Sequence, residues 1–423
     1  MAELMRRPKL LFLCQTLPYP PDGGVWIRTY HVLRLLARTF DITALCFERA
    51  GTSGQGVAFD AALGRLAKVA VFELPQKHSR IRFAWDHFRS LATRRVYTTY
   101  LYDSRTFRRR LADELNSTAF DVVHVDSLDL ARYFPACREL PVVCVHHDIE
   151  SLLLARRAAV ETNPWKRAYL EFQAGLMRDV ERRWAPRIAL NVVCSERDAA
   201  RLKEIAPGAA TAIVPNGVDT NAFVPDRGTG SGIAFVGGTN PAPNFDALTF
   251  FCQQVLPHLN AAAPDARVRW IGRASPEQQV EYQERYGVEL TGYVSDEKPL
   301  MREAACHVVP LRVGGGTRLK ILNAWAMGKA VVSTSIGCEG LDAIDGDNIL
   351  IRDEPAAFAA AVADVLANAA LRERLGQRGR ATAERRYSWD AIGPSMIDTY
   401  LSVAARAATC QTVPLESSFA FQR

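Results

Sequence analysis

The chain has 423 residues, of which 48% are hydrophobic and 23% charged, a composition typical of a globular protein with more than one domain. No apolar run reaches the roughly 18 residues that a membrane-spanning helix needs, and no signal-peptide core precedes the first apolar run. The nine cysteines are scattered without a CxxC pair. This pattern predicts reduced, buried thiols and a cytoplasmic protein.

The positive charge is concentrated in one stretch of the chain. Residues 77–110 hold ten Lys and Arg against two Asp, whereas the net charge of the whole chain is only +6. Aromatic residues from Phe83 to Tyr102 are interleaved with these charges, a pattern that suits a helix lying on an anionic membrane. We therefore expect residues 77–110 to make a peripheral contact with the inner face of the cell membrane; a solvated helix with core aromatics is the alternative. No nucleic-acid-binding motif accompanies the charge, so nucleic acid is not expected as a partner.

Short apolar runs alternate with helical patterns along the first half of the chain. Lys9–Cys14 is followed by a loop rich in Pro and Gly and by a helical pattern over Trp26–Ala37. Further strands are predicted at Ile42–Cys46, Val69–Phe72, Val122–Val125, Val142–Val145 and Val192–Cys194. Continuous apolar strands joined by helices predict a parallel sheet covered on both faces.

The same pattern restarts after a linker-like stretch at residues 214–232. Strands are predicted at Ile233–Val236, Val268–Ile271, Val288–Leu290, His307–Pro310, Ala330–Ser333 and Ile349–Ile351. The sequence therefore predicts an α/β protein with two Rossmann-like, doubly wound parallel-sheet domains, residues 1–213 and 214–388, that face a cleft. A helix over residues 389–408 is expected to cross back to the first domain, and residues 409–423 to form a mobile tail.

Several motifs together resemble the family 4 (group 1) retaining glycosyltransferases of the GT-B fold. The strongest is LRVGGGTRLKILNAWAMGKAVVSTSIGCEGL at residues 311–341. It is supported by LPYPPDGGVWIRTYH (17–31), HHDIES (146–151), VPNGVDTNAF (214–223), FVGGTNPAPNFDAL (235–248) and TGYVSDE (291–297). The resemblance covers nearly the whole chain in the family's order and is closest to a bacterial branch tied to surface polysaccharide assembly.

This resemblance implies a hexosyltransferase that moves a sugar, with retention, from a nucleotide-sugar donor to a glycan or lipid-linked acceptor. The first domain would hold the acceptor and the second the donor, in exopolysaccharide or cell-surface polysaccharide biosynthesis. No DxD-like motif ends a strand, so neither an essential metal nor another cofactor is expected. The alternative is a non-catalytic GT-B-like subunit that binds sugar nucleotide or a partner enzyme, because several motif positions depart from the family pattern.

The Gly-rich loop before a helix predicted at Thr317–Met327 would cradle the donor diphosphate, because a helix N-terminus presents free N–H groups and partial positive charge. The family carries Glu at the positions of Gly315 and Asn323, and many relatives carry Arg and Lys at those of Gly238 and Asn244. Arg318 and Lys320 would then supply the positive charge. The predicted donor-binding residues are Gly24, Gly238, Asn244, Gly315, Gly316, Thr317, Arg318, Lys320, Asn323 and Glu339.

In the first domain, His147 follows the strand Val142–Val145, where the resemblance implies a catalytic histidine beside the donor sugar. Asp148 is expected to orient its imidazole, and Arg28 to contact the acceptor. His146 should point the opposite way and pack structurally, since neighbouring residues of a strand alternate between faces. No pair of carboxylates at recognisable spacing supports a two-carboxylate scheme. The resemblance implies front-face attack, in which the departing diphosphate accepts the acceptor's proton.

Overall fold

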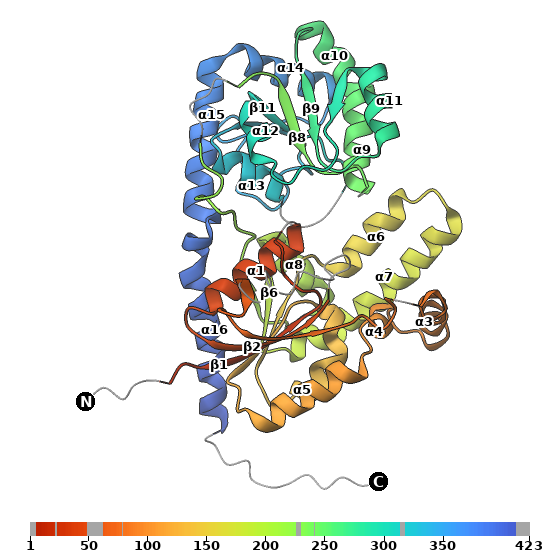
Figure 1. Ribbon diagram of the computed structural model, residues 1–423, viewed down its shortest axis with the longest axis vertical. Coiled ribbons are helices and arrows are strands. Elements are labelled where there is room, and N and C mark those ends of the chain that lie inside the picture. The colour runs from red at the N-terminus through yellow and green to blue at the C-terminus, as the bar shows by residue number, and fades with distance from the viewer. Residues whose placement is uncertain are drawn as a thin grey trace, which may run out of the picture. The chain divides into compact units, whose positions relative to one another are not determined.

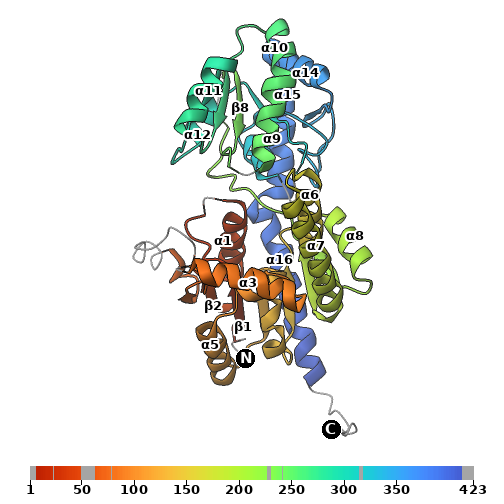
Figure 2. The ribbon, with the colours of Figure 1, turned by 90° about the vertical axis from the view of Figure 1, so that its right-hand side faces the viewer.

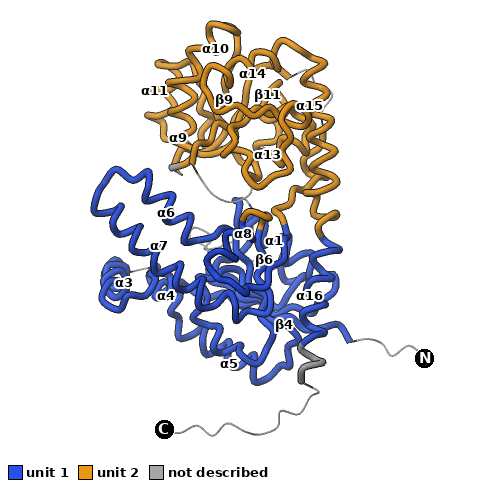
Figure 3. The backbone as a smooth tube through the Cα atoms, turned by 180° about the vertical axis from the view of Figure 1, so that it is seen from behind, with its two compact units in different colours: residues 1–193, 198–214, 393–423 blue, residues 194–197, 215–392 orange. Residues whose placement is uncertain are grey.

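The computed structural model describes residues 6–21, 23–48, 62–77, 79–225, 230–240, 242–313 and 318–411. Figure 3 shows the two compact units into which the chain divides. Unit 1 comprises Met1–Val193, Asp198–Val214 and Gly393–Arg423, and unit 2 comprises Cys194–Arg197 and Pro215–Ile392. The main boundary, between residues 214 and 215, lies one residue from the predicted one.

Unit 1 is built on a seven-stranded parallel sheet in the order β3-β2-β1-β4-β5-β6-β7. The strands are β1 (Lys9–Cys14), β2 (Asp41–Phe47), β3 (Lys68–Phe72), β4 (Val122–Val125), β5 (Val142–Val145), β6 (Leu190–Val193) and β7 (Thr211–Ile213). The last of these was not predicted from the sequence. Because β4 pairs with β1 rather than with β3, the strand order reverses between β1 and β4.

Helices cover both faces of this sheet, as the continuous apolar strands predict. On one face, Phe12 of β1 stacks on His124 of β4, whose ring lies against Tyr400 of helix α16 (Trp389–Gln411). On the other face, Leu11 and Leu13 belong to a core cluster with residues of α5 (Arg105–Ser117) and of the 3₁₀ segment η1 (Leu128–Cys137). Successive β1 residues thus serve opposite faces.

The other described helices of unit 1 are α1 (Gly24–Leu36), α3 (Arg80–Thr93), α4 (Thr98–Leu101), α6 (Glu150–Val160) and α7 (Pro164–Trp184), with α8 (Glu196–Ile205) beginning in unit 2. Helices α6 and α7 lie side by side as a hairpin in both Figure 1 and Figure 2. The side chain of Asn163 starts α7 by accepting from the backbone N–H groups of Trp165 and Lys166. An Asn at this position satisfies two N–H groups that the helix itself cannot.

Unit 2 has a six-stranded parallel sheet in the order β10-β9-β8-β11-β12-β13. Its strands are β8 (Ile233–Val236), β9 (Val268–Ile271), β10 (Val288–Leu290), β11 (Cys306–Val309), β12 (Ala330–Ser333) and β13 (Leu350–Ile351). Its helices are α9 (Ala242–Phe250) with the π segment η3 (Phe251–Val255), α10 (Leu256–Ala262), α11 (Pro276–Tyr286), α12 (Lys298–Glu303), α13 (Leu319–Ala326), α14 (Pro355–Ala367) and α15 (Ala369–Thr382). The strand order reverses between β8 and β11. The predicted α/β architecture of two doubly wound sheets is confirmed.

Three helices have bounds other than those predicted. Helix α1 spans Gly24–Leu36 rather than Trp26–Ala37, and α13 ends at Ala326 rather than Met327. Helix α13 begins at Leu319 rather than at Thr317, and the glycine loop 314–317 lies outside the described residues. Helix α16 continues to Gln411, three residues past the predicted end, since neither Pro nor Gly occurs between Ala408 and Pro414. The rest of the predicted mobile tail, residues 412–423, is outside the described residues.

Within the described residues, no single helix is both long and apolar enough to cross a membrane, although the bent pair Pro355–Ala367 and Ala369–Tyr387 passes by length and composition. The eight described cysteines are all buried, and none of them forms a disulfide.

Candidate active site

In unit 1 the thiol, carboxylate and imidazole groups that could take part in chemistry lie where the strand order reverses. The carboxyl ends of β1, β4 and β5 are neighbours in the sheet. Cys14 ends β1, Asp126 directly follows β4, and His146 and His147 directly follow β5. The reversal point of a doubly wound sheet leaves a crevice at these strand ends, where ligands bind in such folds.

The Asp126 carboxylate is the centre of this group and is 1% exposed. One oxygen, Oδ1, lies 3.3 Å from His147 Nε2 and 3.6 Å from His124 Nε2. The other, Oδ2, accepts the Thr29 hydroxyl at 2.8 Å and the Cys14 thiol at 3.5 Å. The single carboxylate therefore joins β1, α1, β4 and the segment that follows β5.

The electrostatics of this group favour an ionised Asp126. Burial by itself would raise the pKa of a carboxyl group, but the interactions with His147 and His124 outweigh it and hold the pKa of Asp126 well below its ordinary value. Burial lowers the pKa of His124, so its ring favours the neutral form. His147 Nε2 also lies 3.2 Å from the backbone oxygen of Asp126. Because both oxygens that face Nε2 are acceptors, this nitrogen carries a proton.

The predicted residues of unit 1 fall around this carboxylate or near it. His147 is buried and in direct contact with Asp126, whereas His146 turns away and its Nε2 lies 3.0 Å from Asn191 Oδ1. The expected alternation of these two histidines is confirmed. Gly24 is the first residue of α1, and the guanidinium of Arg28, one turn later, is buried and donates to the carbonyl of Val214 at 2.8 Å.

The carboxylate found beside His147 is Asp126, which the sequence analysis did not single out. Asp148 is half-buried and directly follows His147 in the chain, and its orienting role stays a prediction. A signal for Asp126 exists in the sequence, because it is the first acidic residue after the apolar run Val122–Val125. Polar residues that follow a buried strand are candidates for the ligand-binding edge of the sheet.

In unit 2 the corresponding place is the carboxyl end of β8, where the backbone lies close to the side chains of Asn244 and Lys320. Gly237 and Gly238 follow β8, and Gly237 has φ +152°, which favours glycine. A Cβ on Gly237 would lie 2.7 Å from Asn244 Nδ2 and 3.0 Å from Lys320 Nζ. Lys320 Nζ donates to Asn244 Oδ1 at 3.1 Å, and Asn244 Nδ2 donates to the Gly238 carbonyl at 2.9 Å. The structure therefore brings three predicted donor-binding residues, Gly238, Asn244 and Lys320, into one chain of contacts.

Lys320 has neutral close neighbours within the described part of unit 2. Besides Asn244, its ammonium lies 4.8 Å from the centroid of the Phe235 ring. Burial, together with the positive charge of Arg318, lowers the pKa of Lys320 to about 8. A half-buried ammonium whose described neighbours include no carboxylate is unfavourable by itself, so an anion placed here would be stabilised.

Arg318 and Glu339 lie at the start of the same helix. Arg318 is the N-cap residue of α13, is buried, and donates to the carbonyl of Ile336. Its Nη2 lies 3.9 Å from the Glu339 carboxylate, which also pairs with Arg197. The charge of Arg318 is thus partly matched within unit 2, whereas Lys320 forms no ion pair with the described residues of that unit. Asn323 lies on α13, one turn after Lys320, and Gly315, Gly316 and Thr317 are outside the described residues.

Sequence comparison assigns both halves of the chain to sugar transferases. The profile for glycosyltransferase family 4 matches residues 22–222, and that for glycosyl transferases group 1 matches residues 230–368. The chain belongs to the family 4, group 1 glycosyltransferases. A sequence search among curated proteins found no significant match.

Solved structures resemble this glycosyltransferase over nearly its whole length. HepE of Anabaena, crystallised with UDP, is 16% identical with a TM-score of 0.65, covering 93% of this chain and 100% of HepE. Sucrose-phosphate synthase of Thermosynechococcus elongatus is 16% identical with a TM-score of 0.66, covering 94% and 100%. TarM is 11% identical with a TM-score of 0.64, covering 94% and 98%. These likenesses show that the glycosyltransferase has the GT-B fold.

The described residues of the glycosyltransferase contain no group of three or more His, Cys, Asp or Glu side chains arranged to hold a metal ion. Independence from metal stays a prediction.

Replacing Asp126 by Asn should destabilise unit 1 in a pH-dependent way. The folded-state pKa of Asp126 lies below its unfolded value of about 4, so the stability that this carboxylate contributes is present above pH 4 and is lost as the pH falls through the folded pKa. We expect the variant to lose about 2 kcal/mol at neutral pH, and the difference from wild type to shrink in acid, as measured by denaturant unfolding of unit 1 at several pH values.

The matched control is Asp113→Asn, which changes an exposed carboxylate on α5 and should leave stability unaltered. A difference between wild type and Asp126→Asn that is constant from neutral to acid pH would show that ionisation of Asp126 contributes nothing.

Proposed function

We propose that this glycosyltransferase moves a hexosyl group, with retention of configuration, from a nucleotide-sugar donor to a hydroxyl group of a glycan or lipid-linked acceptor. The pathway would be exopolysaccharide or cell-surface polysaccharide biosynthesis, and no metal would be essential. The eight described cysteines are buried and form no disulfide, which supports a reducing, cytoplasmic location. The single observation that carries the proposal is the half-buried ammonium of Lys320, held by neutral groups where a strand end meets a helix start.

A nucleoside diphosphate supplies what this place lacks. Its negative charge would pair with Lys320. Its oxygens could accept backbone N–H groups at the start of α13, where the side chain of the N-cap residue Arg318 makes no capping hydrogen bond. Gly237 has no side chain between the strand end and these groups, so Asn244 and Lys320 lie directly against the backbone there. HepE was crystallised with UDP and with UDP-glucose. We therefore propose a UDP-sugar as the first donor to test.

His147 and Asp126 would act by positioning and by electrostatics. The contact with Asp126 holds the imidazole in one orientation with Nε2 protonated, and a preorganised polar group of this kind stabilises charge that develops during transfer. In the proposed reaction the acceptor oxygen forms a bond to the anomeric carbon as the bond to the diphosphate breaks. The departing diphosphate takes the acceptor's proton. Lys320 would stabilise the negative charge that grows on the leaving group.

The alternative is a non-catalytic subunit that binds a sugar nucleotide or a partner enzyme. It is motivated by Asn323 and Gly315, which stand where relatives carry glutamates. The contact between His147 and Asp126 favours catalysis, because a subunit that only bound a nucleotide in unit 2 would have no use for an oriented imidazole in unit 1.

The proposal is tested by thermal-shift measurements with UDP-, GDP-, ADP- and dTDP-sugars, with and without a divalent metal, followed by transfer assays with the sugar that binds. Ligand at a hundredfold excess over Kd should stabilise the folded state by about 2.7 kcal/mol. NMR of the product identifies the anomer. A shift without metal, followed by a retained anomer, supports the transferase. A shift without transfer to any acceptor supports a subunit that binds a sugar nucleotide. No shift with any nucleotide contradicts the transferase and favours a subunit that binds a partner enzyme.

Lys320→Ala should lower kcat/KM by the equivalent of about 2–4 kcal/mol, because one preorganised contact to the leaving diphosphate is lost. Steady-state transfer kinetics measure the change. Arg285→Ala removes an exposed cation from α11 of the same unit and serves as the control. Turnover of Lys320→Ala within threefold of wild type would contradict the assigned role.

The affinity for UDP should fall as the pH rises through about 8. Lys320 titrates there in the free protein, and the diphosphate prefers the charged form, which is present below this pKa and lost above it. Titration calorimetry from pH 7 to about 9.5 measures the dependence, and Lys320→Arg should remove it because Arg stays charged throughout. An equally steep pH dependence in Lys320→Arg would assign the titration to another group.

A further inference from the structure

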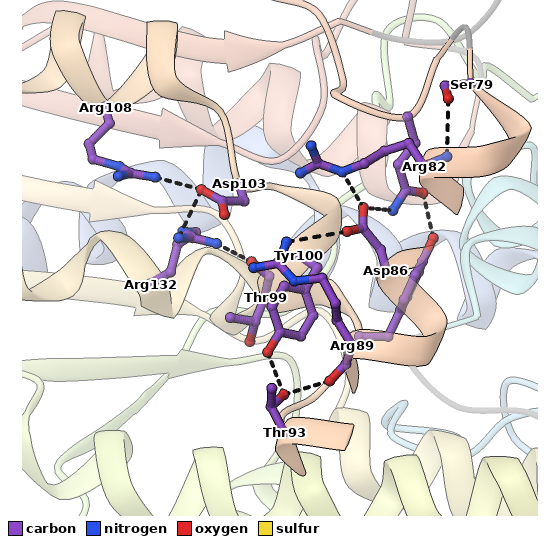
Figure 4. Close-up of polar contacts among 12 residues, drawn as sticks. Ser79, Arg82, Asp86, Arg89, Thr93, Thr99, Tyr100, Asp103, Arg108 and Arg132 are labelled. Atoms are coloured by element: carbon purple, nitrogen blue, oxygen red, sulfur yellow. Dashed lines mark hydrogen bonds and ion pairs between the residues drawn. The ribbon is translucent and has the colours of Figure 1, made fainter. Parts of the chain in front are cut away.

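Helix α3 turns its polar residues toward the protein. Asp86 is fully buried, and its carboxylate accepts from Gln76 Nε2 at 2.7 Å and Arg82 Nε at 2.8 Å, with Arg89 3.6 Å away. Figure 4 shows Arg82 and Arg89 on either side of this carboxylate. One turn later, Ser90 is buried and accepts from Gln173 of α7 at 2.8 Å. These contacts fix the rotation of α3 about its own axis.

The opposite side of α3 is apolar and faces solvent. The large side chains there keep much of their surface exposed: Ile81 84%, Trp85 54%, Phe88 57% and Leu91 49%. With the exposed Ala84 and Ala92 they recur every three or four residues, so they lie on one side of the helix, which we name the α3 apolar face. The rings of Trp85 and Phe88 stack with centroids 5.4 Å apart. Helix α3 is seen nearly end-on at the margin of unit 1 in Figure 1 and from its side in Figure 2.

This arrangement is the reverse of that of an ordinary surface helix, which buries its apolar stripe and exposes its polar one. The buried contacts of Asp86 and Ser90 prevent the helix from turning the apolar face inward. A contiguous exposed apolar patch on a folded protein marks a surface that meets a partner or a membrane.

The charge around the α3 apolar face is positive. Residues 79–95 contain five arginines and one aspartate, and that aspartate, Asp86, is buried against two of them. Arg80, Arg94 and Arg95 are exposed at the two ends of the helix. Arg94 and Arg95 also line a cavity of about 410 Å³, whose other charged lining residues are Arg132, Arg183, Asp129 and Asp179. An anionic surface would complement this distribution of charge.

The two interpretations of residues 77–110, a membrane contact and a solvated helix with core aromatics, apply to different parts of this segment. The change comes at the end of α3. Tyr100 and Tyr102 are buried, and Phe107 on α5 is fully buried in the core cluster. Phe83 packs edge-on against His87 and so lies off the apolar face, although half of it is exposed. The core interpretation therefore holds for residues 97–107, whereas residues 81–92 expose their apolar side chains.

We propose that the α3 apolar face docks on a lipid bilayer that contains anionic lipids. Its aromatic and aliphatic side chains enter the boundary between headgroups and acyl chains, and the arginines at both ends of the helix bind lipid phosphates. A second copy of the chain fits less well, because two surfaces of the same net positive charge would repel each other. The proposal goes beyond sugar transfer, since docking needs neither donor nor acceptor.

Co-sedimentation of the full-length protein with vesicles tests the docking. Wild type should bind vesicles of phosphatidylcholine with one-third phosphatidylglycerol, and should bind pure phosphatidylcholine weakly. Trp85→Ser with Phe88→Ser should lower the affinity roughly tenfold or more, because two inserted aromatic side chains are lost. Arg94→Gln with Arg95→Gln should lower affinity for the anionic vesicles only. All four side chains are exposed, so folding, checked by circular dichroism, should be unchanged.

Val280→Ser with Tyr293→Ser is the matched control, since it removes two exposed apolar side chains from unit 2 and should leave vesicle binding as in wild type. The thermal shift with UDP should be the same in every variant, so failure of docking is distinguishable from failure of the proposed transferase. Equal vesicle binding by wild type and Trp85→Ser/Phe88→Ser would overturn the proposal. So would a wild-type dimer that the same variant dissociates, without vesicle binding.

Discussion

A doubly wound parallel sheet reverses its strand order at one place, and the loops that leave the two strands there run to opposite faces. Both units obey this constraint, between β1 and β4 in unit 1 and between β8 and β11 in unit 2. The backbone itself therefore leaves an opening at these strand ends. Asp126 follows one of the strands and Gly237 another, so the topology decides where reactive side chains can be gathered.

The Asp126 carboxylate in unit 1 and the Lys320 ammonium in unit 2 differ in the partners that surround them. The Asp126 carboxylate has protonated partners on both oxygens and is complete without a ligand. The Lys320 ammonium has an amide oxygen and a ring face as close neighbours. A buried charge with a partner fixes the geometry of a site. A buried cation without one lowers the stability of the folded protein, and a bound anion would restore that stability. In the proposed reaction, unit 1 would thus supply a preorganised positioning group, and unit 2 a place for an anionic substrate.

The sequence predicted most strands because each is a continuous apolar run, and β1, β8 and β9 begin and end at the predicted residues. It missed β7, whose three residues are half-buried or exposed and leave no apolar signal. It found His147 but not Asp126, because the contacts of Asp126 with Cys14 and Thr29 join residues 112 and 97 positions apart. Spacing along the chain reveals faces of one element, but contacts between distant elements depend on how the sheet is ordered.

Helix α3 shows why periodicity alone does not determine which side of a helix is buried. Its apolar residues recur at the spacing that ordinarily marks a core-facing stripe, yet they face solvent because Asp86 and Ser90 are held by neighbouring elements. Complete burial of a large apolar side chain contributes about 1.5–3 kcal/mol, and Trp85, Phe88 and Leu91, about half exposed, forgo part of it. Turning the helix would instead expose the arginine-paired carboxylate and break the bond to Gln173. Since the polar side is already satisfied, an apolar phase outside the protein is what can recover the missing burial, and the flanking arginines favour one with an anionic surface.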